Sequence, residues 1–493
     1  MCANKMMDTG NRQSSAGGKT IKSLGVFALA MINIAAVLTL RKFPPMAEYG
    51  WSSIGWCMLG AVFFLIPLSL STAEMATGWP KGGGVYAWVR EAFGESWGFF
   101  AVWCEWAQNL VWFPTVLSFI ASSFAFAINP DLANNGLFLF TVMMTAFWGC
   151  TIVNIFGQKV AGKFNNIGVV IGTVIPAFFM IVLGIAYPLL GNTIQIPFSP
   201  SALLPQLNFS TLPFVATVVM LFFGMEMAGY HAMETRNPSR DFPRAILLSA
   251  SFILAVTLAC TLAIAFVVPQ NNISFSAGIM QAFQVFLDTF HLAWLIGPIA
   301  VLITVGALAQ LATWMAGPAK GLGAVALRGN LPPVFRYQNR HGSPTAVLLI
   351  QGVIGTVISM LFLFVPNASS AYWFLTAMMV QLLCITYFLM FASVIRLRYT
   401  QPQTPRAYRI PGGRTGVWIV SVSGCLACLY TIAMSFLPPT AISHLNIWAY
   451  ALPMLLGTAA LAIPPFIFLK FKKPNWSSPS QDSNGSGTVD QQP

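Results

Sequence analysis

The sequence is poor in charged residues. Of its 493 residues only 8% are Asp, Glu, Lys or Arg, whereas 56% are apolar. Soluble domains carry about 25% charged residues, so this chain has too little polar surface for a set of ordinary water-soluble domains. The mean hydropathy of +0.71 agrees with this. The composition therefore indicates an integral membrane protein, and its 40 Phe, 40 Gly and 32 Pro residues favour bent, closely packed helices over the short strands of a β-barrel.

Side chains that could perform chemistry are also scarce. The four histidines fall at predicted loops or span ends on both sides of the membrane, which speaks against a metal cluster or a catalytic triad. Cys425 and Cys428 form a C-x-x-C inside an apolar run, where packing thiols are expected rather than a redox site. The glycine run 82–84 lacks the Lys-Ser or Lys-Thr of a phosphate-binding loop. We therefore expect no enzyme activity, no metal and no cofactor.

Long stretches without any charge define the membrane spans. A spanning helix needs about 20 apolar residues, and only helices or closed barrels satisfy the backbone within lipid. Division of these stretches at Pro, Gly and Asn clusters predicts an all-α membrane protein with twelve transmembrane helices. They lie at about 24–43, 54–76, 97–128, 136–156, 165–190, 211–232, 244–268, 290–319, 344–365, 371–395, 416–437 and 447–469.

The basic residues test this span count. With twelve spans, 23 of the 25 Lys and Arg residues fall on the side of the N-terminus. The positive-inside rule then places both termini in the cytoplasm. We expect the membrane to be the inner (plasma) membrane. The net charge of +12 is thus a topology signal, and we expect no nucleic-acid partner. The exceptions are Arg41 and Lys42, which lie near the outer end of the first span.

The two tails are expected to be simple. Residues 1–22 are too polar to act as a cleavable signal and are predicted to form a cytoplasmic N-terminal tail. Residues 474–493 are predicted to form a disordered cytoplasmic tail. Between them, residues 23–473 form the membrane domain.

Two spans contain polar interruptions at membrane depth, where polar groups are costly and mark transport paths. In the first, Asn33 lies in mid-span, and Arg41-Lys42 followed by Pro44-Pro45 is expected to end the helix early. In the sixth, Gly224 and Gly229 flank Glu226, as expected for an unwound helix centre. The alternative is a tight glycine packing contact with Glu226 paired to a neighbour.

The positions of these interruptions suggest an internal repeat. Spans one and six are five apart, so two copies of a five-span unit would run in opposite directions through the membrane. Interrupted helices at corresponding positions of two such halves point to the central site of a transporter. The positive end of a half-helix suits a carboxylate and free carbonyls suit an ammonium group, so the pair of breaks could hold a zwitterion.

Several motifs resemble a known group of transporters. EMATGWPKGGGVYAWV after span two, the pattern of Glu226, Glu234, Asn237, Pro238, Arg240 and Pro243, and W-x-x-G-P-x-K-G from Trp314 to Gly321 are similar to the amino acid-polyamine-organocation (APC) transporter superfamily. Within it, RKFPPMAEYG after span one and PQNNISFSAGIMQAF from Pro269 to Phe283 resemble the bacterial glutamate:GABA antiporter family. The resemblance covers about residues 20–470.

The resemblance implies a fold and a site. The fold would be a 5+5 inverted repeat with helices one and six broken and helices 11 and 12 outside it. Repeat one would cover about 24–190, repeat two about 211–399, and helices 11 and 12 about 416–470. The substrate would lie at the breaks, walled also by spans three, eight and ten. The residues so implied are Ala35, Ala36, Thr39, Gln108, Asn109, Gly224, Glu226, Tyr230, Gln310, Trp314, Gln381 and Tyr387.

Arg41 joins these candidates because of a departure from the family pattern. Arg41-Lys42 stands where glutamate antiporters have aromatic and acidic residues, and Gln310 takes a position that resembles an acidic one. Arg41 could bind an acidic substrate bidentately, or it could reach outward or pair with Glu48. The C-terminal tail also lacks the long basic extension that plugs some members, which puts that form of pH gating in doubt.

Two functions fit this reading. The first is an amino-acid antiporter that exchanges an amino acid, glutamate or a related acidic or neutral one, for a related amino acid or its decarboxylation product by alternating access. The alternative is a proton-coupled amino-acid uptake permease of the same fold, with Glu226 or Glu105 carrying the proton. The expected partners are amino-acid substrates and the lipid bilayer, and the sequence leaves open whether the protein forms a homodimer.

Overall fold

The computed structural model describes residues 24–80, 84–157, 167–205, 211–229, 235–274, 276–360, 368–438 and 446–476. These residues form helices, turns and loops, and their one β contact is the isolated bridge between Leu24 and Thr235. The predicted all-α class is confirmed.

Nine helices of the described residues are long and apolar enough to cross a membrane, or ten when one bent pair is counted as a single span. The structure thus confirms a multi-pass membrane protein, while the count of twelve spans and the inverted repeat stay predictions. The nine run over Ser52–Gly78, Glu95–Ile128, Gly136–Ile155, Ile167–Leu189, Arg240–Val267, Ala293–Leu327, Tyr372–Thr400, Gly413–Met434 and Ile447–Lys470.

The labelled α-helices divide these spans and add shorter elements. They are α1 (Val26–Val37), α2 (Phe43–Ala47), α3 (Ser52–Gly60), α4 (Ile66–Gly78), α5 (Val85–Phe93), α6 (Glu95–Ile128), α7 (Gly136–Ile155), α9 (Ile175–Leu189), α10 (Val215–Leu221), α11 (Pro238–Val267), α12 (Gly278–Thr289), α13 (Ile296–Leu327), α14 (Thr345–Ser359), α16 (Ala368–Thr400), α17 (Gly413–Met434), α18 (Ile447–Ala462) and α19 (Pro464–Lys470).

The first span is broken, but at a different residue from the one expected. α1 ends at Val37, Leu38 and Thr39 are extended, and the chain resumes as the short helix η1 (Leu40–Lys42) and α2, bent by 48° from α1. The prediction that Pro44-Pro45 ends the helix is wrong. The two prolines lie in the first turn of α2, where the missing N–H groups would have no helical acceptor in any case.

The sixth span is also interrupted. α10 ends at Leu221, and residues 222–229 continue as turns and a single tight helical turn. Gly224 has φ +110°, a conformation that residues with a Cβ rarely adopt. The unwound centre predicted from Gly224 and Gly229 is therefore present.

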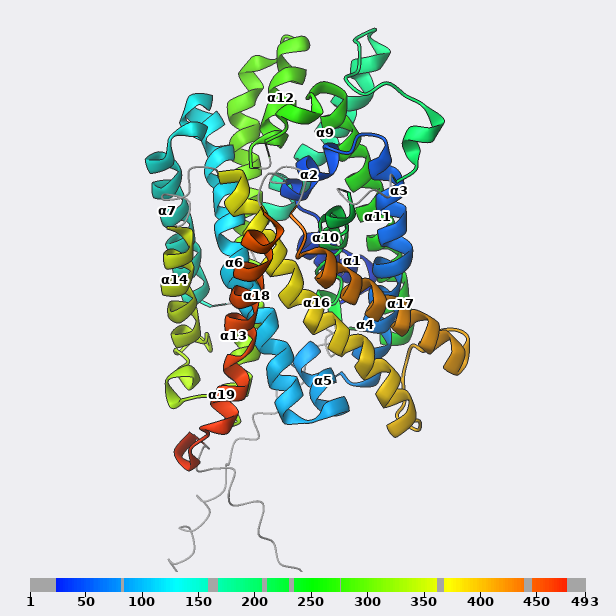
Figure 1. Ribbon diagram of the computed structural model, residues 1–493, viewed down its shortest axis with the longest axis vertical. Coiled ribbons are helices and arrows are strands. Elements are labelled where there is room, and N and C mark those ends of the chain that lie inside the picture. Colours follow the sequence, from blue (N-terminus) through cyan, green and yellow to red (C-terminus); the bar gives the residue numbers. More distant parts are fainter. Residues whose placement is uncertain are drawn as a thin grey trace, which may run out of the picture.

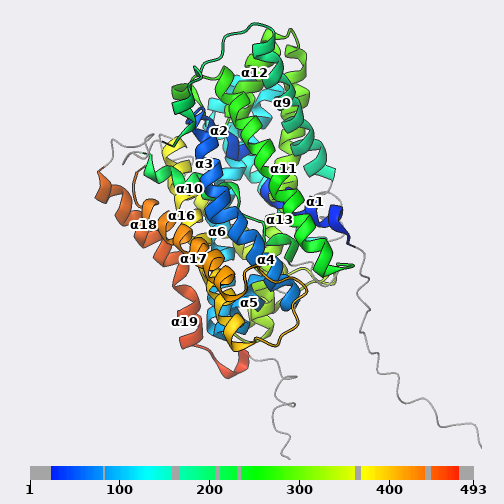
Figure 2. The same cartoon turned by 90° about the vertical axis from the view of Figure 1, so that its right-hand side faces the viewer.

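The long helices pack around these two breaks. α6 is buried along most of its length and packs against α5, α7, α13 and α16. Figure 1 shows α10 in the middle of the molecule near α16, with α5 and α19 at one end and α9 and α12 at the other, and Figure 2 shows α1 near the edge of the molecule beside α11. Figure 2 shows α17, α18 and α19 on one side and α9 and α11 on the opposite side. The residues of the two breaks, Leu38 and Thr39 in the first and 222–226 in the second, are buried within the protein.

A buried ion cluster closes one end of this core. Glu74 of α4 accepts hydrogen bonds from Arg398 at the end of α16 and from the backbone N–H of Ile410, at 2.9 Å each. It also pairs with Arg406, whose Nε lies 3.4 Å away, and both side chains are 1% exposed. Arg406 in turn donates to the carbonyls of Leu397 and Gln401, at 3.0 Å each. These contacts fix the loop after α16 onto α4.

Candidate functional site

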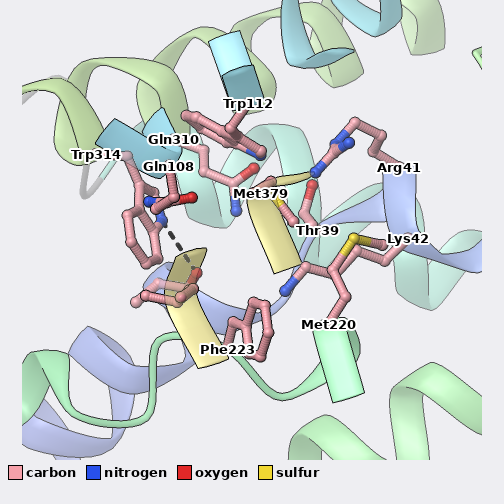
Figure 3. A pocket seen from close by; sticks show the side chains of 12 residues that line it. Thr39, Arg41, Lys42, Gln108, Trp112, Met220, Phe223, Gln310, Trp314 and Met379 are labelled. Carbon is pink, nitrogen blue, oxygen red and sulfur yellow. Dashed lines mark hydrogen bonds between the residues drawn. The ribbon is translucent and has the colours of Figure 1, made fainter. Parts of the chain in front are cut away.

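A narrow cavity lies between the two helix breaks and the walls formed by α6, α13 and α16. Figure 3 shows its side chains, with the charged groups of Arg41 and Lys42 both turned towards the same space. The residues that line it are Ala36, Thr39, Arg41, Lys42, Gln108, Trp112, Met220, Phe223, Gln310, Trp314, Met379 and Leu383. Six of the thirteen residues proposed from the sequence belong to this lining: Ala36, Thr39, Arg41, Gln108, Gln310 and Trp314.

The breaks free backbone carbonyls, and side chains of the protein bind three of them. A helix leaves its last carbonyls without an intrahelical partner, and such groups need a donor when buried. The Lys42 ammonium donates to the carbonyl of Val37 at 3.0 Å and to that of Leu221 at 3.3 Å. The Trp314 indole N–H donates to the carbonyl of Ala36 at 3.3 Å, a bond drawn in Figure 3. Lys42 thus joins the ends of α1 and α10.

Arg41 lies inside the protein and faces the cavity. It is 1% exposed, and one of its guanidinium nitrogens, Nη1, donates to the hydroxyls of Thr115 at 3.1 Å and Tyr372 at 3.2 Å. Its guanidinium lies 5.9 Å from the ring centroids of Trp112 and Tyr372. Among the described residues Arg41 forms no ion pair, and its Nε is buried without an acceptor. This position favours binding of a ligand over an outward reach.

Glu226 belongs to a hydrogen-bonded group behind the cavity. The Tyr387 hydroxyl donates to Oε2 of Glu226 at 2.9 Å and accepts the backbone N–H of Gly224 at 3.2 Å. Oε1 of Glu226 is buried without a hydrogen-bond partner among the described residues. Tyr387 of α16 therefore holds the unwound segment of span six through both its backbone and its carboxylate.

Asn33 fixes the same segment from the side of α1. Its Oδ1 accepts the backbone N–H of Ala228 at 3.2 Å, and its Nδ2 donates to the hydroxyl of Ser249 in α11 at 3.2 Å. The polar interruption noted in span one thus satisfies a backbone group that the break in span six exposes.

The polar residues of α6 and α13 connect the walls. Gln108 donates to Asn109, and Asn109 donates to the carbonyl of Trp314 at 2.8 Å. Gln310 lines the cavity, and its Oε1 is buried without a partner among the described residues. Asn109 thus holds α13 in place, while Gln108 and Gln310 face the cavity.

The remaining proposed residues lie elsewhere. Four of them are outside the lining but take part in the hydrogen bonds described above. Asn109 bonds to the lining residues Gln108 and Trp314, and Tyr387 bonds to Gly224 and Glu226. Ala35 is half-buried and is not among the lining residues. Gln381 faces α18, where its Oε1 accepts the Thr458 hydroxyl at 2.6 Å. Tyr230 lies outside the described residues.

Sequence reasoning did not assign six lining residues. They are Lys42, Trp112, Met220, Phe223, Met379 and Leu383. Helical spacing could have found some of them, since Trp112 follows Gln108 by four residues, and Met379, Leu383 and Tyr387 repeat at intervals of four. Apolar residues in apolar helices give no other signal.

The charge of the cavity wall is positive. Its lining contains Arg41 and Lys42 and no Asp or Glu. Glu226 interacts electrostatically with Lys42 from outside the lining, so the charge of Arg41 remains for a ligand to balance. The site therefore suits a small molecule that carries a carboxylate.

An all-helical membrane protein with a charged cavity between two broken helices has the construction of a small-molecule transporter. Comparison with known proteins gives the family: the one described as amino acid permease matches residues 24–460. The chain belongs to this family of membrane transporters, which confirms the superfamily resemblance noted above.

Individual relatives cover nearly the whole chain. An uncharacterised transporter of Legionella pneumophila is 38% identical over 450 residues, which cover 91% of this chain and 97% of that protein. A glutamate/gamma-aminobutyrate antiporter of Lactococcus lactis subsp. lactis is 31% identical over 453 residues, 90% of each chain. Its counterpart from subsp. cremoris is 30% identical over 477 residues, 95% of this chain and 93% of that protein.

Proposed function

We propose that the protein is an amino-acid antiporter of the inner membrane, with both termini cytoplasmic. It exchanges an amino acid, glutamate or a related acidic or neutral one, for a related amino acid or its decarboxylation product. Two relatives of about the same length are named as glutamate/gamma-aminobutyrate antiporters, which supports this substrate class. The observation that carries the proposal is the buried Arg41, which faces a cavity between two broken helices without an acid partner among the described residues.

In this mechanism the residues of the cavity have distinct roles. Arg41 binds a carboxylate of the substrate, and Gln108 and Gln310 contact its polar remainder. Spans one and six move as the gate, because their unwound segments allow each half of the helix to tilt separately. Tyr387 and Glu226 couple the break of span six to α16, which would transmit the movement to the wall of the cavity.

Transport into reconstituted vesicles tests the mode of exchange. Vesicles preloaded with unlabelled glutamate should take up labelled glutamate much faster than empty vesicles. Equal uptake into empty vesicles would reject antiport. If that uptake collapsed when a protonophore was added, the alternative of proton-coupled uptake would replace it.

Substitution of Glu226 tests its role in this movement. Glu226→Gln keeps the size of the side chain and the acceptor for Tyr387 but removes the charge. We expect a large change in the exchange rate or in its dependence on pH, and Asp288→Asn at the end of α12 is a matched control for the loss of a carboxylate far from the cavity. If Glu226→Gln exchanged like the wild type at every pH, Glu226 would be structural.

A further inference from the structure

The ammonium group of Lys42 occupies a distinctive position. Val37 is the last residue of α1, Leu221 is the last residue of α10, and Lys42 donates to the carbonyls of both. The C-terminal end of a helix carries a partial negative charge, so two such ends close together form a site for a cation. Lys42 is buried, with 6% of its surface exposed. The cation at these two helix ends is therefore the ammonium group of the protein's own lysine.

In a transporter with broken helices, carbonyls of this kind are available to a bound cation or to the ammonium group of a substrate. Here the final carbonyls of both half-helices already have the Lys42 donor, and the carbonyl of Ala36 has the Trp314 indole. An ammonium group of a ligand would have to displace Lys42 and leave a second positive charge beside it. Two like charges so close together in a buried site repel strongly.

The neighbouring residue Arg41 supplies the complementary interaction. Arg41 has a buried Nε without an acceptor among the described residues, and the lining contains no carboxylate. A planar guanidinium with free donors matches the two oxygens of a carboxylate. The neutral donors and acceptors of Gln108 on α6 and Gln310 on α13 also line the cavity, where a second carboxylate or an amide could bind.

We propose that Lys42 takes the place of the ligand's ammonium group at the two helix ends, so that the cavity selects its ligand by negative charge and binds dicarboxylates that have no amino group. This inference deepens the proposed function, on which it rests for the use of the cavity as a transport site. It states that the carboxylates of the substrate are recognised and that its amino group is not.

Competition in the unmodified protein gives the first test. Labelled glutamate bound to the purified full-length protein is displaced with glutarate, which has the same two carboxylates and no amine, and with 4-aminobutyrate, which has one carboxylate and an amine. We expect glutarate to compete within about threefold of glutamate and 4-aminobutyrate at least about tenfold more weakly, the difference of one charged interaction. A loss of about thirtyfold or more for glutarate would overturn the inference.

Direct binding of labelled glutarate separates this inference from the proposed function. If glutamate is exchanged but glutarate neither binds nor competes, the proposed function stands and the inference is wrong. If glutarate binds but no amino acid is exchanged, the inference stands and the proposed function is wrong. If neither compound binds, both are wrong.

Substitution of Lys42 gives the second test. Lys42→Met keeps a similar length and removes the ammonium group, which frees the carbonyls of Val37 and Leu221 for a ligand. We expect the ratio of glutamate to glutarate affinity to rise at least about tenfold in this variant. Lys42→Arg keeps the cation and should leave the ratio within about threefold of the wild type. An unchanged ratio in a folded Lys42→Met protein would contradict the inference; if that variant does not fold, the glutarate competition in the wild type decides.

Discussion

Gly224 is the residue of the site at which a single methyl group should have the largest effect. Its φ of +110° is rarely adopted by a residue with a side chain. A Cβ added there would lie 3.2 Å from the carbonyl oxygen of Ala36 and 3.2 Å from Cζ2 of Trp314. Gly224→Ala therefore acts on the contact between the two helix breaks.

The size of the effect follows from the conformation. A residue with a side chain held in a sparsely populated φ region costs about 1–3 kcal/mol. That corresponds to a roughly 5- to 150-fold fall in the population of the arrangement seen here. The two close contacts add to this cost, since one of them is with backbone that cannot rotate away. We expect the exchange rate in preloaded vesicles to fall by a factor in this range and the midpoint of thermal unfolding to decrease.

Gly191→Ala is the matched control for this experiment. Gly191 also has a positive φ, +84°, but a Cβ there would meet nothing within 4 Å, and it lies in the turn after α9. Its substitution keeps the backbone strain without the collision and should leave the exchange rate near that of the wild type. If Gly224→Ala also exchanged and unfolded like the wild type, the break of span six would not be held against α1 as described.

Three further substitutions test other parts of the structure. Tyr387→Phe removes the described donor to Oε2 of Glu226 and should lower the stability by about 1–3 kcal/mol, measured by denaturation in detergent; an unchanged stability would mean that the bond contributes nothing. Arg41→Lys keeps the charge but loses the planar fork and should weaken glutamate binding about tenfold, and equal affinity would exclude bidentate binding. Glu74→Gln leaves the buried Arg406 and the partly buried Arg398 without their carboxylate and should cost about 3–5 kcal/mol. Faster proteolysis within residues 401–412 would report this change, whereas wild-type cleavage would contradict the role of the cluster.

The membrane spans were predictable because the bilayer imposes one simple requirement. Uninterrupted apolar runs of about 20 residues are needed wherever a helix crosses, and the absence of charge over 245–287 or 341–395 is a direct mark of it. The predicted span 97–128 agrees with α6, which ends at Ile128. The break in span six was also predictable, since glycine is the residue that positive φ requires.

The walls of the cavity were harder to predict because helical faces are not fixed by polarity alone. The family resemblance implied Gln381 of α16 as a wall residue, yet it lies about 120° around the helix from Tyr387, since six residues turn by about 600°. Its amide instead meets Thr458 of α18. In an interior helix, polar residues on every face find partners, so only the three-dimensional packing shows which face meets the cavity.

The prediction of the first break failed for a related reason. Proline was taken as the end of a helix, but a proline in the first turn starts one, and Pro44-Pro45 begin α2. The basic pair, which was part of the same prediction, lies directly after the break. A break within the membrane exposes carbonyls, and each must find a donor or remain at a cost of about 1–3 kcal/mol.

Lys42 is the donor that the chain itself supplies for this purpose, and it explains why two charges survive at membrane depth in so apolar a sequence. A charge inside a membrane protein persists only when its partners compensate for lost hydration. The carbonyls of Val37 and Leu221 do so for Lys42, whereas Arg41 has two hydroxyls, two aromatic rings at 5.9 Å and an unused Nε among the described residues. One cation is satisfied by the fold and the other is not. That difference, invisible in the dipeptide Arg41-Lys42, indicates a structural role of Lys42 at the breaks and supports the proposed role of Arg41 in ligand binding.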